Sequence, residues 1–229
     1  MTLHRFFVAQ DEMAGERFPI PASIERQVRT VLRLRDGDGI VLFGGDGSEA
    51  LCLLSGAECV VHERRSVTTE PQHRLTVVQA LLKGDALEEV IRQATEIGVA
   101  AFRLVVTDRT IARDISPRKL ERLRSIAREA AEQSERGIVP AVDAPVALGE
   151  AFGAEAVLLY ERNADVRLST VEPPRAVIIG PEGGFTEAEA AAATAVGVRL
   201  VGLGPRILRS QTVAAAAASV VLSRTGDFA

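Results

Sequence analysis

Three segments of the sequence combine the end of an apolar run with residues that could bind a ligand: LLYER (158–162), IIGPEGGF (178–185) and LGPRILRSQT (203–212). The second and third segments contain a Gly-Pro pair directly after the run. Proline fixes φ and has no N–H, and glycine adopts conformations closed to other residues, so such loops hold a definite shape. Their backbone groups could bind the polar edge of a ligand while apolar neighbours enclose a ring. The sequence therefore predicts a small-molecule site built from loops.

The same sequence argues against several kinds of chemistry. No Gly-Lys-Ser/Thr follows the glycines, as a phosphate-binding Walker loop requires, and the glycines do not form the fingerprint of a dinucleotide-binding fold. All three histidines (His4, His62, His73) and both cysteines (Cys52, Cys59) precede residue 74. A site in the C-terminal two thirds would therefore have no cysteine nucleophile, no Ser-His-Asp triad and no zinc centre, and we expect no metal. Chemistry that depends on positioning and electrostatics remains.

The region around these segments alternates apolar runs with helical patterns. The predicted strands are 74–82, 101–107, 154–161, 175–180 and 198–204, and the predicted helices are 85–98, 116–134, 186–197 and 210–223. This alternation is typical of an α/β fold with a mostly parallel sheet. Ligands of such sheets bind beyond the carboxyl ends of the strands, where all three segments lie.

Residues at the helix ends support these bounds. Ser116 suits an N-cap and Pro117 the first helical position, while Gly98 ends the helix before it. The last helix is rich in alanine, which lets another helix or backbone approach closely. A role in the core and a role in a subunit interface are both open for it.

The first 70 residues predict a small β-rich unit. A strand is predicted at 4–9, followed by a helix with Ser23 as N-cap. The apolar stripe of that helix consists of Ile24, Val28, Val31 and Leu32. Residues 39–56 predict two strands around a glycine turn rather than a phosphate loop, because no helical pattern follows. The polar segment 64–74, which contains a proline, marks the boundary with the alternating region.

Composition describes a globular protein. Of 229 residues, 47% are hydrophobic and 25% charged, and no apolar run approaches the roughly 20 residues of a membrane span. The N-terminus has no signal-peptide pattern, so we expect a cytoplasmic protein with free thiols. The net charge of −4 argues against a protein that coats nucleic acid, yet residues 103–136 carry nine Lys/Arg against six Asp/Glu. That segment is either a phosphate-binding surface or a solvated helix face.

Four segments, in this order, resemble one known family: KGDALEEVIRQATEIGV, AREAAEQSERGIVP, IIGPEGGFTEAE and LGPRILRSQT. Together with RFFV and VLRLRDGDGIVLFGGDG near the N-terminus, they are similar to the RsmE family, ribosomal RNA small subunit methyltransferase E. The similarity runs along nearly the whole chain. The pairing of GPEGGF with a later LGPRILR is specific.

The resemblance implies a two-domain enzyme of the α/β class. Residues 1–70 would form a PUA-like β-barrel domain that binds RNA. Residues 71–229 would form a SPOUT methyltransferase domain, a mostly parallel sheet flanked by helices with a deep trefoil knot at its C-terminal end. The implied cofactor is S-adenosylmethionine (SAM), and the implied substrate is N3 of one uridine in 16S ribosomal RNA of the small ribosomal subunit. The implied assembly is a homodimer.

The resemblance also assigns residues to these roles. The implied cofactor site comprises Leu159, Tyr160, Glu161, Ile179, Gly180, Pro181, Glu182, Gly183, Gly184, Leu203, Gly204, Ile207, Leu208 and Arg209. Arg209 is the first candidate catalytic residue, and Arg5 the second, because an arginine would stabilise the charge on a deprotonated uracil. The predicted RNA contacts are Arg5, Arg33, Arg109, Arg113, Arg118, Arg122 and Arg136.

The chain departs from the family at Gln27, Gln93 and Gln211, where the family commonly has His, Lys and Glu. The first two bear on RNA contacts, and the third on any role for a carboxylate beside the site. Two other functions stay open. One is a SPOUT enzyme that modifies another RNA position, such as a ribose hydroxyl. The other is an RNA-binding assembly factor without catalysis, against which the intact loops argue.

Overall fold

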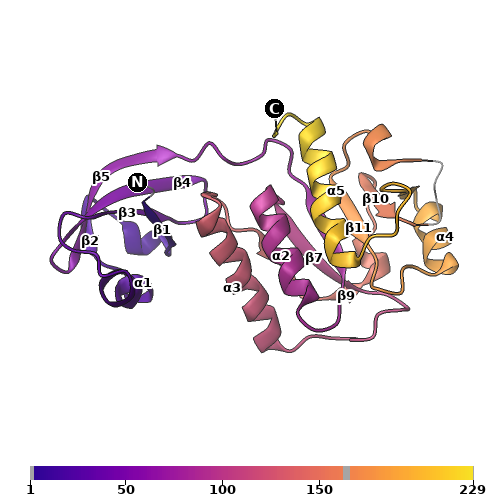
Figure 1. The fold of residues 1–229 in the computed structure, drawn as a ribbon, viewed down its shortest axis with the longest axis horizontal. Coiled ribbons are helices and arrows are strands. Elements are labelled where there is room, and N and C mark those ends of the chain that lie inside the picture. Colours follow the sequence, from indigo (N-terminus) through magenta and orange to yellow (C-terminus); the bar gives the residue numbers. More distant parts are fainter. Residues whose placement is uncertain (1–2, 162–165, 229) are drawn as a thin grey trace. The chain divides into compact units, whose positions relative to one another are not determined.

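The computed structural model describes residues 3–161 and 166–228 (Figure 1). Its internal contacts divide the chain into two compact units. The first consists of residues 1–70 with residues 131–139, and the second of residues 71–130 with residues 140–229. The division after Glu70 falls inside the boundary segment expected from the sequence. Nothing in the sequence pattern pointed to residues 131–139 as part of the first unit.

The first unit is built on a five-stranded mixed sheet. Its strands, in the order in which they pair, are β1 (His4–Phe7), β3 (Gly39–Phe43), β4 (Ser48–Ser55), β5 (Glu58–Ser66) and β2 (Arg17–Pro19). β1 and β3 pair in parallel, and the other pairs are antiparallel. The β3–β4 hairpin confirms the two strands predicted around a glycine turn. Alternate side chains of these strands, such as Phe6, Ile40, Leu42 and Leu54, share the buried face and form the core.

The helix of this unit differs from its prediction. α1 (Ala22–Arg26) begins directly after Pro21, so Ser23 lies inside the helix and is not its N-cap. A π-helical turn (Gln27–Val31) follows. Because a π turn is wider than an α turn, it shifts the phase of the side chains. Val31, predicted on the buried stripe, is therefore 64% exposed.

The second unit contains a sheet in which every pair of strands is parallel. Its strand order is β12 (Arg199–Val201), β10 (Ala156–Leu159), β11 (Ala176–Ile179), β6 (Thr76–Ala80), β7 (Ala101–Val106) and β8 (Ala141–Val142), with β9 (Val146–Ala147) also paired to β7. All five strands predicted for this region are present, which confirms the parallel α/β sheet. The two-residue strands β8 and β9 are too short to stand out in the sequence.

The longer helices beyond residue 70 are α2 (Ala86–Ile97), α3 (Pro117–Gln133), α4 (Glu187–Ala195) and α5 (Ser210–Arg224). As predicted, Pro117 opens α3, and Ser116 Oγ accepts the N–H of Lys119 (3.2 Å) as its cap. Gly98 ends α2 with a φ of 111°, a left-handed value that favours glycine. Short 3-10 helices lie at Gln10–Met13, Leu148–Ala151 and Leu168–Thr170. No helix in the described part of the chain is long and apolar enough to cross a membrane.

α4 and α5 lie on opposite faces of the parallel sheet. α5 packs on β6 and β11, and α4 packs against β12. α2 lies beside α5 (Figure 1). Val78 and Ala80 of β6 belong to one core cluster with Ala190 and Ala193 of α4. Successive strand residues point to opposite faces. Gln79, between Val78 and Ala80, therefore faces the layer of α5.

Candidate functional site

The loops that follow β12, β10 and β11 line one cavity of about 660 Å³. These three strands are consecutive in the sheet, and parallel strands bring their carboxyl ends to one edge, so the loops meet there. β10 lies between the two strands that are followed by Gly-Pro, so those two strands do not pair with each other. All residues predicted for the cofactor site line this cavity: Leu159, Tyr160, Glu161, Ile179, Gly180, Pro181, Glu182, Gly183, Gly184, Leu203, Gly204, Ile207, Leu208 and Arg209.

The cavity has further lining residues beyond the individually assigned cofactor residues: Ala86, Phe185, Gly202, Pro205, Arg206, Ser210, Gln211 and Val213. All but one of them lie within the loop segments predicted from the sequence or within a few residues of those segments. Ala86 is different. It opens α2, far from the loops in sequence, and no sequence signal pointed to it.

Glycines let the loops pack closely on one another. Gly184 has a φ of 68°, a left-handed conformation that favours glycine. A Cβ added there would lie 2.8 Å from Oε1 of Glu161, and a Cβ added at Gly180 would lie 3.1 Å from the ring of Phe185. Contacts between and within the loops therefore require these glycines, whatever ligand the cavity holds.

Arg109 supports the turn at residues 183–185 from outside the cavity. Its Nη1 donates to the carbonyl oxygens of Gly183 (2.8 Å) and Phe185 (3.3 Å). A Cβ added at Gly183 would lie 3.3 Å from the Cβ of Arg109. In the structure, Arg109, which the sequence assigned to RNA, therefore holds a wall of the cavity.

Further hydrogen bonds tie the same loop to the segments that follow β6 and β7. The Glu182 carboxylate accepts the backbone N–H of Lys83 (3.0 Å). Thr186 caps α4 by accepting the N–H of Glu189 (3.1 Å), and Glu189 accepts the N–H of Thr186 in return (2.8 Å). The N–H of Asp108 also donates to Glu189 (2.8 Å). The loop is thus fixed at three points along its length.

The other predicted RNA contacts differ in their exposure. Arg113 donates to two backbone carbonyls of the segment 107–108 at 3.0 Å each. Arg33 is exposed and has a left-handed φ of 57°. Arg118 is exposed, with no polar partner among the described residues. The Arg122 side chain is 51% exposed and lies near two glutamates.

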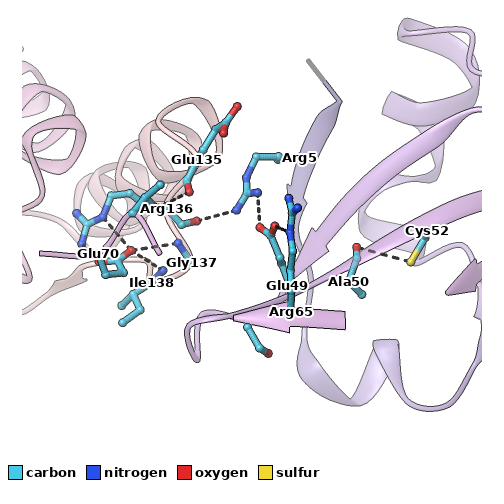
Figure 2. A network of polar contacts seen from close by, with 12 residues as sticks. Arg5, Glu49, Ala50, Cys52, Arg65, Glu70, Glu135, Arg136, Gly137 and Ile138 are labelled. Carbon is cyan, nitrogen blue, oxygen red and sulfur yellow. Dashed lines mark hydrogen bonds and ion pairs between the residues drawn. The ribbon is translucent and has the colours of Figure 1, made fainter. Parts of the chain in front are cut away.

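Arg5 and Arg136, also predicted to contact RNA, belong to a buried polar network in the first unit (Figure 2). Arg5 forms an ion pair with Glu49 and donates to the carbonyl oxygen of Arg136 (3.2 Å). Arg136 pairs with Glu70 (2.8 Å). Only 7% of the Arg5 side chain and 3% of the Arg136 side chain are exposed. Both guanidinium groups therefore hold residues 131–139 to the rest of the first unit.

Glu49 is the carboxylate at the centre of this network. It also pairs with Arg65 (2.6 Å), and its side chain is 4% exposed. Burial by itself raises the pKa of the Glu49 carboxyl, but the hydrogen bonds from Arg5 and Arg65 outweigh it and hold the pKa below its usual value. Glu49 is therefore ionised at neutral pH, as its two partners require.

Two arginines at the cavity have no such internal role. Arg206 and Arg209 line the cavity, are exposed and form no ion pair with the described residues. Arg209 directly precedes α5, yet its side chain does not cap the helix. Their guanidinium groups are thus available to a ligand, and an anion that forms beside them would be stabilised.

The lining of the cavity fits SAM. Its volume lies within the range of ligand pockets. Apolar side chains such as Leu159 and Ile179 suit the adenine ring, and the carboxylates of Glu161 and Glu182 suit the positive charges of the ammonium and sulfonium groups. The backbone of the glycine-containing loops adds hydrogen-bonding groups.

Comparison with known proteins gives a consistent result. Residues 68–222 match a family model described as an RNA methyltransferase domain. Ribosomal RNA small subunit methyltransferase E of Synechocystis sp. is 35% identical over 91% of this chain and 74% of its own length. The protein of the same name from Mycobacterium bovis is 36% identical over 84% of this chain and 80% of its own.

Solved structures agree with the sequence relatives. Ribosomal RNA small subunit methyltransferase E of Neisseria gonorrhoeae, bound to SAM, matches with a TM-score of 0.91 at 29% identity over the whole of both chains. A putative methyltransferase from Legionella pneumophila, in complex with SAM, matches with a TM-score of 0.86 at 26% identity over 98% of each chain.

Proposed function

This chain belongs to the RsmE family, ribosomal RNA small subunit methyltransferase E, and from that premise we propose that it methylates N3 of one uridine in 16S ribosomal RNA. It is a SAM-dependent RNA methyltransferase. One observation carries the proposal most directly. The three loops that resemble the family's cofactor loops converge on a single cavity whose lining fits SAM.

We assign SAM to this cavity. Glu161 and Glu182 would face its positive groups, and the loops 180–184 and 203–209 would bind it through their backbone. The fixed shape of the first of these loops supports the assignment, because a loop held by Arg109 and Lys83 loses little freedom on binding.

SAM, when bound, supplies a methyl group on a sulfonium sulfur that is a good leaving group. The task of the chain is to hold the uracil so that N3 is aligned with that group and shielded from water. For N3 to accept the methyl group, it must lose its proton. Deprotonation puts negative charge on O2, N3 and O4 of the uracil, and Arg209 at the cavity would stabilise it. Glu182 or a water molecule at the cavity mouth would take the proton.

The exposed arginines Arg33, Arg118 and Arg122 are the proposed phosphate contacts. Phosphate contacts position an RNA without reading its sequence. Selection of the uridine would come from a splayed, single-stranded base and the shape of the site around it. For Arg5, Arg109, Arg113 and Arg136 the internal hydrogen bonds favour a structural role over the RNA contact expected from the sequence. Arg5 is for the same reason a weak candidate for catalysis.

We also propose the finer architecture of the family for this chain: a PUA-like barrel domain in residues 1–70, a SPOUT domain with a deep trefoil knot in residues 71–229, and a homodimer. The full-length likeness to the Neisseria gonorrhoeae structure supports the two domains. Half-buried small side chains of α5, among them Ala215 and Ala216, would let a second copy approach closely. Sedimentation of the purified protein at several concentrations tests the dimer.

The test of function is methyl transfer from labelled SAM to small ribosomal subunits that lack the modification, with free 16S RNA in parallel. Digestion and mass spectrometry of the product should give 3-methyluridine. Label on a ribose hydroxyl would show that the enzyme methylates the ribose and not N3. SAM binding without any transfer of label would favour an RNA-binding assembly factor that has no catalytic activity. Arg209→Ala should lower the rate. Arg199→Ala is the matched control, since Arg199 is an exposed arginine outside the cavity lining.

A further inference from the structure

Among the described strands of the parallel sheet, one buried residue is polar, and it is a glutamine. Gln79 lies on β6 in the run Thr76–Ala80 and is fully buried. A buried amide is unfavourable unless it is hydrogen-bonded, so its position in a central strand calls for a specific set of partners. Because Gln79 faces the layer of α5, those partners lie on that side of the sheet.

The partners of Gln79 lead to the cavity. Its Nε2 donates to Oγ of Ser210, the first residue of α5 (3.1 Å), and to the carbonyl oxygen of Ala80 (3.1 Å). The Ser210 hydroxyl in turn donates to the carbonyl oxygen of Gly180 (2.7 Å). Ser210 and Gly180 both line the cavity, whereas Gln79 lies behind them.

The direction of this chain of hydrogen bonds is determined by chemistry. A hydroxyl has one hydrogen to donate, and Ser210 gives it to Gly180, whose carbonyl can only accept. Ser210 must then accept from Gln79, so the amide presents its NH₂ group. A flipped amide would place its oxygen against the carbonyl of Ala80, where two acceptors repel. The Gln79 Oε1 is left without a partner among the described residues.

The chain joins three segments that are distant in sequence: the end of β6, the loop after β11 and the start of α5. Gln79 holds Ser210, and Ser210 holds the Gly180 carbonyl. These two bonds set the spacing between the loop after β11 and the loop before α5. A hydrogen bond elsewhere in α5 has no such effect. Ser219 Oγ, for example, donates only to Ala215 within the helix (2.9 Å).

We propose that Gln79 and Ser210 are positioning residues for the methyl donor: a buried amide–hydroxyl pair that fixes the loops at Gly180 and after Leu203 in the spacing that SAM requires. The proposal rests on the assignment of SAM to this cavity. The new element is a role for Gln79, which does not line the cavity and would act on SAM only through Ser210. The unpartnered Oε1 fits such a role, because leucine in its place would fill the core without an unsatisfied acceptor.

The test is SAM titration by calorimetry with Ser210→Ala, Gln79→Leu, the double variant and Ser219→Ala as the matched control. Ser210→Ala should raise the Kd for SAM about tenfold, equal to about 1.4 kcal/mol. Gln79→Leu should raise it less, because the Ser210–Gly180 bond remains. The double variant should match Ser210→Ala alone, because both residues act through one chain of bonds. Ser219→Ala should bind as the wild type does.

A second measurement needs no cofactor. Hydrogen exchange of the backbone amides at residues 180 and 182–184 should be faster in SAM-free Ser210→Ala than in wild type, and unchanged in Ser219→Ala. Gln79→Leu keeps a side chain of similar size and tests the proposal from the other end of the chain if Ser210→Ala folds poorly. Wild-type SAM affinity in Ser210→Ala, or additive effects in the double variant, would overturn the proposal. A wild-type protein that does not bind SAM would instead overturn the assignment of the cavity.

Discussion

Arg109 and Gly183 are held in contact across 74 residues of sequence: the arginine Nη1 lies 2.8 Å from the glycine carbonyl oxygen. A Cβ added to the glycine would lie only 3.3 Å from the Cβ of the arginine. The arginine and the glycine thus fit one another, and both lie at the wall of the cavity. This relationship favours a support for the cofactor loop over a phosphate contact as the role of Arg109.

Arg109→Ala should raise the Kd for SAM about tenfold, because hydrogen bonds to a charged donor contribute about 1.5–3 kcal/mol. It should leave the salt dependence of small-subunit binding unchanged. Calorimetry with SAM and subunit binding at several salt concentrations measure the two effects separately. A fall of roughly one in the salt slope, with unchanged SAM affinity, would identify Arg109 as a phosphate contact.

Arg118 and Arg122 should give the opposite pattern. Replacing both with alanine should lower the salt slope of subunit binding by roughly one for each phosphate that the protein no longer neutralises, and should do so equally for all RNA sequences. SAM affinity should not change, since neither residue lines the cavity. Arg199→Ala is the control for the loss of a positive charge. If the slope of the double variant equals that of the control, this face of α3 is merely solvated.

Gly184→Ala should abolish most SAM binding. Alanine at a left-handed φ costs about 1–2 kcal/mol, and its Cβ would displace the Glu161 carboxylate that lines the cavity. Gly197→Ala is a matched control, because Gly197 has a φ of 88° but no atom within 4 Å of an added Cβ. Both variants should lose similar stability in urea denaturation. Only Gly184→Ala should lose SAM affinity, and equal losses of affinity would mean that backbone strain alone is responsible.

Glu49 makes the stability of the first unit depend on pH. Its folded-state pKa is lowered, so the stabilisation is present above the unfolded pKa of about 4.5 and is lost as pH falls through the folded value. Glu49→Gln should therefore destabilise the protein at pH 7, by about 1.5–3 kcal/mol for hydrogen bonds to charged groups. The difference from wild type should shrink as the pH falls below about 4.5. Urea denaturation across pH measures it, and a difference that stays constant would show that the ionised carboxylate contributes nothing.

The sequence predicted the cavity better than it predicted the arginines. The three loops were found because their signals are local: each follows an apolar run predicted as a strand, and two of them contain a Gly-Pro pair. The role of an arginine depends on what lies opposite its guanidinium. Gly183 for Arg109 and Glu49 for Arg5 are far away in sequence, and no local pattern encodes either pairing.

The surroundings of Val31 and Gln79 were also not predictable from the sequence pattern. Val31 is exposed because a π-helical turn adds width that an apolar pattern spaced for an α-helix does not reveal. Gln79 was part of a predicted strand, and its type alone did not show that Ser210 would lie against it. The contact between Gln79 and Ser210 appears only when segments distant in sequence are packed together.

Gln211 occupies the position where the family commonly has glutamate, and its surroundings bear on what that exchange means. It is half-buried, lines the cavity, and also lines a neighbouring groove of about 480 Å³. Its side chain forms no hydrogen bond with the described residues, so it does not hold the loop after Leu208 in place. The groove contains Asp85, Glu88, Glu89 and Arg92.

Gln211→Glu should change the methylation rate by no more than about tenfold, on the order of 1.4 kcal/mol in the barrier. A new carboxylate would join several acidic neighbours, which disfavours its charge but leaves the cofactor loops intact. Methyl transfer from a sulfonium depends more on alignment than on a strong base. Methylation of subunits that lack the modification, measured across pH for both proteins, tests this. An inactive wild type that Gln211→Glu activates would show that the missing carboxylate is the proton acceptor, and that this chain binds RNA without modifying it.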